Sequence, residues 1–457
     1  MPRFKVKTTT QFVGSQLRNL LSGLVWIGLY LLFCLLPLLL LIGQDNPPGR
    51  PFLVEFSVAL GFVGLSILAL QFVLIARFQV VAAPFGIDAL LKFHVQITFV
   101  GLAFVLAHPI LLFVADSKYI PLLNVFTAPW RARFAFASVF VLLALVVLSV
   151  WRRRLKLRYE VWHISHSLLA VAVVLFALLH VGLVGFYVTG LIRLVVYDVY
   201  IGGLIFLLLW IRVISPLMRY RRPWRVVEVR PEYGQASTLM VEPVGHSGFR
   251  FDPGQFGWIA VGRSPFSITQ HPFSFSSAAD TPDGGVISIT IKAAGDFSRT
   301  IPSVAPGTRV FLDGPHGVFS MDRRQAPGYV FIAGGVGVTP FYSMLCTMKE
   351  RGDVRPVTLF YANPRWEEII LRDQLSQLEA AMPNVTVVHV LSRPEPSWTG
   401  ESGRITTELL RRHLPLQFRR YEYLICGSTQ MMDAMEDSLV EADVPAGQIS
   451  SERFDMA

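Results

Sequence analysis

Long apolar runs fill the first half of the chain, whereas short apolar runs broken by polar residues fill the second half. A helix needs about 20 apolar residues, at a rise of ~1.5 Å each, to cross a bilayer. Six segments reach this length: 19–42, 54–78, 90–115, 134–151, 161–185 and 190–215. The pattern therefore predicts six membrane-spanning helices.

After Ser215 the pattern becomes that of a soluble α/β protein. Runs rich in β-branched and aromatic residues, separated by glycine and proline, predict strands at Trp224–Val229, Ser237–Val241, Val286–Ile291 and Arg309–Leu312. From Tyr329 onward strands alternate with helices, which is typical of a parallel sheet. The expected strands are Tyr329–Ala333, Val357–Tyr361, Val385–Val390 and Tyr423–Cys426, and the expected helices are Pro340–Arg351, Glu367–Ala381, Thr406–His413 and Thr429–Ala442.

These patterns predict an architecture of three parts. Residues 1–216 are expected to form a six-helix transmembrane bundle. Residues 217–325 are expected to form an antiparallel β-barrel, and residues 326–457 a parallel α/β domain of the dinucleotide-binding type.

Charge fixes the expected orientation of the membrane part. The net charge is +9, and basic residues crowd the ends of the apolar runs, with clusters within 3–18, 152–158 and 219–225. The positive-inside rule assigns such clusters to the cytoplasmic side, so both termini are expected in the cytoplasm. This distribution argues against nucleic acid as a partner. The apolar stretch Leu20–Ile42 is too long for a signal-peptide core, and we expect it to be the first span.

Histidines inside the predicted spans are the first candidates for chemistry, because ionisable side chains are costly there. His94 and His108 lie 14 residues apart in the third span, and His166 and His180 lie 14 residues apart in the fifth. That spacing places each pair close to one helix face, ~21 Å apart along the axis. Two such helices can hold two stacked b-type haems, each bound by two imidazoles. Polar core histidines are the alternative, and His163 could replace His166.

With the N-terminus inside, His94 and His166 would hold the inner haem, and His108 and His180 the outer haem. A haem carries single electrons, whereas a nicotinamide gives up a hydride. A flavin connects the two because it accepts a hydride and releases electrons singly. The soluble half is therefore expected to bind FAD and a nicotinamide cofactor.

The run His271-Pro272-Phe273-Ser274 resembles the flavin motif of the ferredoxin–NADP reductase superfamily, in the form found in NADPH oxidases and ferric reductases. The resemblance implies that Phe273 packs near the isoalloxazine and that Ser274 hydrogen-bonds to it. It places His271 near the flavin phosphates or ribityl chain. The wider superfamily has Arg and Tyr where His271 and Phe273 stand.

Two further segments extend this flavin site. Gly295 is expected to permit a tight turn, and Ser298 to cap a short helix whose amides could hold the flavin pyrophosphate. The run 313–319 resembles the Gly-Pro-Tyr/His-Gly turn that closes the flavin barrel.

The strongest motif of the soluble half is expected to bind the nicotinamide dinucleotide. It consists of Gly334, Gly335, Gly337, Thr339 and Pro340, after a strand and at the start of a helix. Glycines let the backbone approach a pyrophosphate, and the helix N-terminus favours its charge.

The resemblance also identifies residues around the nucleotide. Arg365 and Arg393 are candidates for a 2′-phosphate, which favours NADPH over NADH, although nearby Glu367 and Glu368 weaken this preference. Cys426 and Gly427 resemble the Cys-Gly turn beside the nicotinamide. Phe454 resembles the C-terminal aromatic residue that covers the flavin until nicotinamide displaces it.

The sequence as a whole resembles bacterial NADPH oxidases. The resemblance implies an oxidoreductase of the inner (plasma) membrane that passes electrons from cytoplasmic NAD(P)H, by way of FAD and two haems, to O2, with superoxide as product. A positive charge beside the outer haem would favour the developing superoxide, and Arg50, Arg131 or Arg133 could supply it. A ferric-chelate reductase and a membrane redox subunit that feeds a protein partner are the alternatives. Apart from membrane lipids and this acceptor, no obligatory partner is expected.

Overall fold

The computed structural model describes residues 9–39, 49–188, 190–262, 264–267, 270–280 and 285–453. Contacts within the chain divide it into a membrane unit, Leu17–Ser215, and a second unit made of Met1–Gln16 and Pro216–Ala457.

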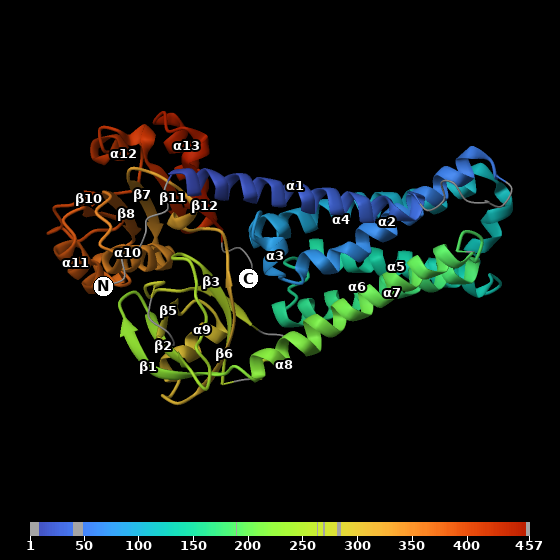
Figure 1. Cartoon of the computed structure of the whole chain (residues 1–457), viewed down its shortest axis with the longest axis horizontal. Coiled ribbons are helices and arrows are strands. Elements are labelled where there is room, and N and C mark those ends of the chain that lie inside the picture. The colour runs from blue at the N-terminus through green and yellow to red at the C-terminus, as the bar shows by residue number, and fades with distance from the viewer. Residues whose placement is uncertain are drawn as a thin grey trace. The chain divides into compact units, whose positions relative to one another are not determined.

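In the described part of the membrane unit, six helical runs are long and apolar enough to cross a bilayer, which confirms the six predicted spans. They lie side by side (Figure 1). They are α1 (Thr9–Leu39), α2 (Phe52–Ile75), α4 (Ile87–Ala115), α5 (Trp130–Val150), α6 (Tyr159–Val184) and α7 (Leu191–Leu209), which continues through the π-helix η2 (Trp210–Ile214) into α8 (Ser215–Tyr220). A short helix, α3 (Gln79–Ala82), lies between α2 and α4.

Successive spans run in opposite directions, so α4 and α6, the third and fifth spans, run parallel. We call the end with loops 49–51, 116–129 and 185–190 the distal end of the bundle. The end with loops 76–86 and 151–158 is the proximal end, from which the chain leaves α7 toward the second unit.

A hydrogen bond at a proline joins α1 to α7. Pro37 lies inside α1 and has no N–H, so the carbonyl of Phe33 loses its usual helical partner. The hydroxyl of Tyr200 on α7 donates to this carbonyl at 2.5 Å. A polar group that would be costly to leave unpaired in a membrane is thereby satisfied by a neighbouring helix.

The first part of the second unit is an antiparallel sheet with the strand order β4-β3-β6-β1-β2-β5. The strands are β1 (Trp224–Glu232), β2 (Ala236–Pro243), β3 (Phe256–Val261), β4 (His271–Ser274), β5 (Ile287–Lys292) and β6 (Arg309–His316). A bridge between Phe275 and Ile289 joins the two edges and closes the sheet into a barrel, as predicted. The sequence reading missed β3, whose six residues are all buried and therefore show no alternation.

The rest of the unit is a sheet with the strand order β10-β9-β8-β7-β11-β12, parallel at every pairing, which confirms the predicted α/β class. Its strands are β7 (Tyr329–Gly334), β8 (Val357–Asn363), β9 (Val385–Leu391), β10 (Glu401–Ser402), β11 (Glu422–Cys426) and β12 (Ile449–Glu452). The helices are α10 (Thr339–Arg351), α11 (Arg372–Ala381), α12 (Thr407–His413) and α13 (Thr429–Glu441).

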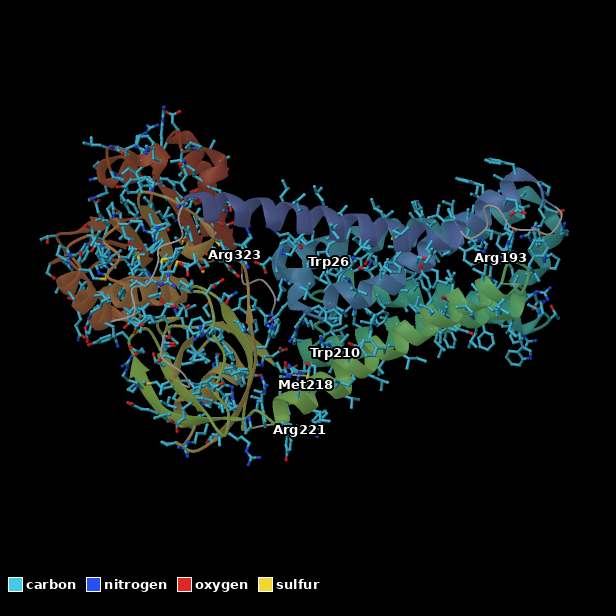
Figure 2. The ribbon with its side chains drawn as sticks, viewed as in Figure 1. Trp26, Arg193, Trp210, Met218, Arg221 and Arg323 are labelled. Carbon is cyan, nitrogen blue, oxygen red and sulfur yellow. The ribbon has the colours of Figure 1, made fainter. Side chains whose placement is uncertain are left out.

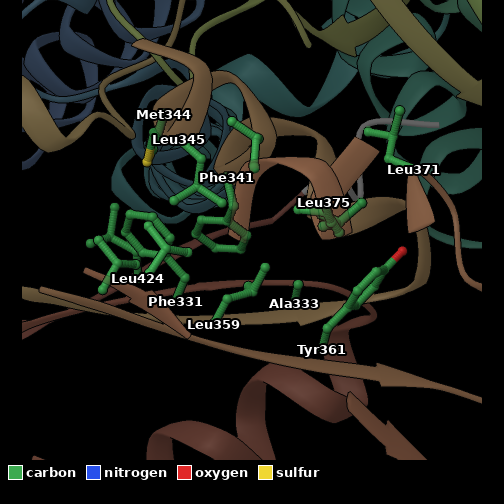
Figure 3. Packing of buried hydrophobic residues seen from close by; sticks show 14 of the residues in the cluster. Phe331, Ala333, Phe341, Met344, Leu345, Leu359, Tyr361, Leu371, Leu375 and Leu424 are labelled. Carbon is green, nitrogen blue, oxygen red and sulfur yellow. The ribbon is translucent and has the colours of Figure 1, made fainter. Parts of the chain in front are cut away.

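One helix start was predicted wrongly. The helix expected from Glu367 begins at Arg372, because Leu371 adopts a left-handed backbone with φ of 58°. The segment before it turns inward instead: Ile369 and Ile370 are buried in the core cluster that also contains Phe331, Phe341 and Tyr361 (Figure 3).

One face of α10 joins the α/β sheet to the barrel. Ser343, Thr347 and Arg351 follow one another at intervals of four residues, so their side chains share a face. The two hydroxyls bond to the barrel backbone, at 2.7 and 2.9 Å. The guanidinium of Arg351 lies 2.5 Å from carboxylate oxygens of both Asp280 and Asp322. The helix that begins at the glycine loop is therefore fixed to the barrel.

Candidate functional site

The membrane histidines form two facing pairs, at the two depths that their spacing predicts. Near the proximal end, the ring centroids of His94 on α4 and His166 on α6 lie 6.4 Å apart. Near the distal end, those of His108 and His180 lie 6.5 Å apart. His163 faces elsewhere, because its ring stacks on Tyr159. The structure thus brings together the four residues that the sequence singled out and separates the fifth.

In the proximal pair, side chains fix the proton on Nδ1 of each ring. The amide nitrogen of Gln71 donates to the carbonyl of Ile67, which turns its oxygen toward Nδ1 of His94, 2.8 Å away. The hydroxyl of Ser149 donates to a backbone carbonyl within α5, so it accepts from Nδ1 of His166 at 3.0 Å. The sequence reading missed both acceptors.

In the distal pair, backbone carbonyls take the same role. Nδ1 of His108 donates to the carbonyl of Ser57 at 3.0 Å, and Nδ1 of His180 donates to the carbonyl of Arg131 at 2.8 Å. The hydroxyl of Ser57 also lies 3.0 Å from Nδ1 of His108. In all four histidines Nδ1 carries the proton, which leaves the lone pair of Nε2 free to bind a metal.

These rings fit the ligation of an iron from two sides. Two imidazoles that bind one metal from opposite sides, at metal–nitrogen distances of about 2.0 Å, have centroids roughly 6 Å apart. Both observed separations match this value. Gly61 of α2 leaves the room that the distal pair needs, because a Cβ there would lie 3.1 Å from the ring of His108.

The predicted flavin residues gather at β4. The ring of His271 stacks on Phe297 with a centroid distance of 4.3 Å, and Phe273 stacks on the same ring at 6.1 Å. Pro272 pairs with β3, and Ser274 is buried at the end of the strand. This order gives one aromatic surface, formed by residues from β4 and the helix α9 (Asp296–Thr300).

Two predicted roles in this region were wrong. Gly295, not Ser298, is the cap residue of α9, because the hydroxyl of Ser298 folds back to accept from the amides of Ala294 and Gly295, at 2.9 and 2.8 Å. Gly295 has an extended backbone, with φ of −143°, so no turn requires glycine there. A Cβ on Gly295 would meet no atom within 4 Å, so its surface faces open space where a cofactor could approach.

A carboxylate from β12, which was not predicted as a site residue, lies beside the barrel turn after β6. Gly317 has φ of 98°, and a Cβ there would lie 3.1 Å from the ring of Phe256 and 3.5 Å from Oε1 of Glu452. Phe256 pairs with Ser274, so Glu452 stands close to the end of the flavin motif. The sequence pattern gives little indication of Glu452 as a site residue. This glutamate is buried only because β12 pairs with β11.

The three glycines of the nucleotide motif, and Gly427 after β11, have distinct tasks. A Cβ on Gly337 would lie 2.4 Å from the carbonyl oxygen of Cys426, and one on Gly334 would lie 2.4 Å from the sulfur of Met431. Gly427 packs against Gly334 from the other strand, where its own Cβ would be 3.4 Å away. Gly335 alone has a left-handed backbone, with φ of 54°, and faces open space. It is the residue at which a pyrophosphate can approach the backbone.

The start of α10 agrees with the prediction. Pro340 stands in its first turn, where a missing N–H costs nothing. The hydroxyl of Thr339 donates to the carbonyl of Val336 at 3.0 Å and so shapes the loop. From the next strand, the hydroxyl of Tyr361 lies 3.0 Å from the carbonyl of Gly335.

The end of β8 offers polar groups to a nucleotide. Within the part of the chain that the structure describes, neither polar atom of the buried Asn363 amide has a hydrogen-bond partner. Arg365 and Arg393, both exposed, follow β8 and β9 and stand side by side, since the amide of Arg393 donates to the carbonyl of Pro364 at 2.8 Å. Burial, followed by the charge of Arg372, lowers the pKa of the nearby His389 to about 4, so this histidine is neutral at physiological pH.

Two predicted residues remain, and only Cys426 lies within the described part of the chain. Cys426 has no exposed surface and packs in the core cluster beside Ala333, so its place beside the nicotinamide stays a prediction. Phe454 lies outside the residues that the structure describes.

Comparisons with known proteins agree with this division of the chain. The family described as "Ferric reductase like transmembrane component" matches residues 60–177, and "Oxidoreductase NAD-binding domain" matches residues 331–437. The first match contains His94, His108 and His166, and the second contains the glycine loop.

Similar proteins match part of the chain. NADH-cytochrome b5 reductase 1 of Debaryomyces hansenii is 30% identical over 171 residues, which are 36% of this chain and 60% of the relative. Ferredoxin–NADP reductase B of Sorangium cellulosum is 28% identical over 242 residues, 50% of this chain and 96% of the relative. A solved FAD/NAD-binding domain of nitric oxide dioxygenase from Vibrio cholerae has a TM-score of 0.45 and 23% identity, covering 50% of this chain and 97% of that one. The chain spans about 60% of the length of the first relative.

The chain therefore joins a ferric reductase-like transmembrane component to an FAD- and NAD-binding part of the ferredoxin–NADP reductase type. The match to the transmembrane component and the six apolar helices support an integral membrane protein.

Proposed function

We propose that the chain is a transmembrane oxidoreductase that moves electrons from NAD(P)H, bound by the second unit, to an acceptor at the distal end of the bundle. FAD and two b-type haems are the proposed carriers. The observation that supports this most is the set of four histidines, which stand in two facing pairs with every Nδ1 proton directed to an acceptor. Bis-histidine haems transfer single electrons.

In the second unit, the chain's own residues suit FAD and the dinucleotide. His271, Phe273 and Phe297 provide a stack of aromatic rings, and the open face of Gly295 admits a pyrophosphate. Gly335 admits a second pyrophosphate at the start of α10. A flavin supplies the exchange between hydride and single electrons when it is bound.

The proposed acceptor is O2, with superoxide as the product. Three arginines were candidates for the positive charge at its site. Arg50 pairs with Glu55 and Tyr187, and Arg133 donates to the carbonyls of Ala128 and Phe126. Arg131 is exposed, and its backbone carbonyl accepts a hydrogen bond from Nδ1 of His180. We therefore assign the acceptor site to the Arg131 side of the distal pair.

A ferric chelate is the second candidate acceptor, because the membrane unit matches the ferric reductase-like family and many chelates are anionic. We further propose that the proximal end and both termini face the cytoplasm of a bacterium, following the basic residues at 152–158.

Superoxide dismutase distinguishes the two acceptors. The purified protein, supplied with FAD and NADPH in air, should reduce cytochrome c, and the dismutase should abolish that signal. Reduction that persists in the presence of the dismutase would mean that electrons pass directly to the acceptor. Reduction of ferric citrate without oxygen would then identify a ferric reductase.

Arg365 and Arg393 should determine the preference for NADPH over NADH. Replacing both Arg365 and Arg393 by alanine should raise the KM for NADPH by about 10-fold or more and leave that for NADH nearly unchanged, because a charge-assisted hydrogen bond to phosphate contributes about 1.5–3 kcal/mol. Steady-state flavin reduction with both cofactors measures this. Arg404→Ala, which removes a positive charge elsewhere in the same domain, is the control. An equal rise for both cofactors would exclude a 2′-phosphate site.

A further inference from the structure

A tryptophan that the proposed function does not use lies beside the proximal histidine pair. Trp162 precedes His166 by four residues on α6, so the two side chains share a face of the helix. The centroids of their rings are 5.4 Å apart. The indole nitrogen of Trp162 also lies 3.3 Å from the hydroxyl oxygen of Ser149 on α5. The tryptophan therefore contacts both the histidine and the side chain that accepts the histidine's proton.

The hydroxyl of Ser149 uses its full capacity for hydrogen bonds. A serine hydroxyl donates one hydrogen bond and accepts two. Its proton goes to the carbonyl of Leu145, one helical turn back, at 2.8 Å. An indole N–H can only donate, so Trp162 occupies one of the two acceptor positions. The other position receives the N–H at Nδ1 of His166, 3.0 Å away.

The two donors on this oxygen weaken each other. Both draw on the lone-pair density of one atom, so the hydrogen bond from His166 to Ser149 is weaker than it would be without Trp162. A stronger acceptor at Nδ1 makes a ligating imidazole more basic. A more basic ligand stabilises the ferric state of a bound iron over the ferrous state. Removal of the indole N–H should therefore favour ferric iron at the proximal pair.

The ring of Trp162 is held in place from the proximal loop. The guanidinium of Arg152 lies over the indole, 4.8 Å from the ring centroid, which is an attractive cation–π contact. The same guanidinium lies 5.6 Å from the ring centroid of Tyr159, and that ring lies 5.7 Å from the indole. These contacts keep the indole N–H directed at Ser149.

We propose that Trp162 is a positioning residue for the proximal haem: by sharing the oxygen of Ser149, it limits the hydrogen bond from His166 and thereby raises the reduction potential of the iron bound there. This role rests on the proposed function, because it concerns a haem held by His94 and His166. It extends that function to a residue that binds neither the iron nor the acceptor.

The test is a redox titration of the purified full-length protein, followed by its haem absorbance. Trp162→Phe keeps an aromatic ring but removes the donor, so it should lower the midpoint potential of one haem and leave the other unchanged. We expect a change of about threefold in the reduction equilibrium, or about 30 mV for one electron. The same substitution in His180→Ala, which should retain only the proximal haem, identifies the haem that shifts.

A double-mutant cycle determines whether the effect passes through Ser149. Ser149→Ala removes the acceptor and should raise the same potential, opposite in sign to Trp162→Phe. Adding Trp162→Phe to Ser149→Ala should change nothing further, because the shared oxygen is gone. Trp210→Phe is the matched control and should leave both potentials unchanged. Trp210 lies where α7 passes into η2 (Figure 2), and its ring contacts those of Phe78 and Phe206.

Three results would overturn the proposal: no shift in Trp162→Phe, an upward shift, or a shift of equal size with and without Ser149. Trp162→Leu also lacks the donor and must lower the same potential, so it replaces the phenylalanine variant if that variant does not fold. Failure of the proposed function would look different. The wild-type protein would then bind no haem, or His180→Ala would keep both haems.

Discussion

Replacing His108 or His180 by alanine should stop reduction of the external acceptor, while NADPH still reduces the flavin. Each substitution removes one of two imidazoles whose rings lie 6.5 Å apart, and no other histidine takes its place in the pair. Loss of a partner hydrogen bond alone typically costs 10–100-fold at a metal site, so we expect loss of a ligand to lower the external rate by more than about 100-fold. Haem content should fall from two to about one per chain.

Three measurements on the same preparation check this: haem by pyridine haemochrome, flavin bleaching under anaerobic conditions, and acceptor reduction. His163→Ala is a matched control, because it removes a histidine of the same helix that stacks on Tyr159 and faces neither pair. Unchanged haem content in both His108→Ala and His180→Ala would contradict the assignment. Loss of flavin reduction as well would indicate misfolding and not loss of a ligand.

Replacing Gly335 by valine should lower kcat/KM for NAD(P)H by roughly 100-fold and leave the amount of bound FAD unchanged. A Cβ on Gly335 meets no protein atom, so the substitution does not disturb packing. The valine side chain fills the space through which a pyrophosphate would reach the backbone. The left-handed backbone at this position also costs a β-branched residue about 1–2 kcal/mol. The rate of anaerobic flavin reduction against cofactor concentration measures the effect.

Gly352→Val separates the two causes. Gly352 ends the same helix, has φ of 63° and likewise faces open space, so valine there brings the same backbone strain at the opposite end from the nucleotide. We expect it to lower stability slightly and to keep normal kinetics. If both variants lost activity equally, strain would be the explanation and the pyrophosphate site would be wrong.

The membrane histidines show how far the sequence alone could reach. Apolar length determines a span, and 14 residues return a helix close to the same face, so both the spans and the pairing of His94 with His166 follow from periodicity. The separation of His163 also depends on which way α6 faces, and packing against its neighbours decides that. The sequence left this alternative open, and in the structure the ring that lies beside His94 is that of His166.

The acceptors behind the histidines could not be predicted in this way. Gln71 and Ser149 are ordinary polar residues of other spans, and they become acceptors only once α2 and α5 pack beside α4 and α6. The carbonyls of Ser57 and Arg131 carry no signal in the sequence, because every residue has one. Knowledge of helix packing is needed before such contacts can be seen.

In the soluble part, local rules failed where tertiary contacts compete with them. Serine is a favourable residue for a helix cap, yet Ser298 stands at the third helical position. From there its hydroxyl accepts a hydrogen bond from the amide of Gly295. A helix from Glu367 satisfied propensity, but burial of Ile369 and Ile370 pulled the chain into a left-handed turn at Leu371. Glu452 became part of the flavin region only through the pairing of β12, a strand too short to stand out.

The Nδ1 protons of the proximal pair meet side-chain oxygens only, whereas each Nδ1 proton of the distal pair meets a backbone carbonyl, joined at His108 by the hydroxyl of Ser57. Where such an imidazole binds a metal, the strength of that hydrogen bond tunes the electron density on the ring and thereby the reduction potential of the metal. A single codon change at Gln71 or Ser149 can therefore shift the proximal potential. The distal carbonyls survive any substitution that preserves the backbone. If the two pairs hold haems as we propose, the driving force between them is set mainly by substitutions at the proximal pair.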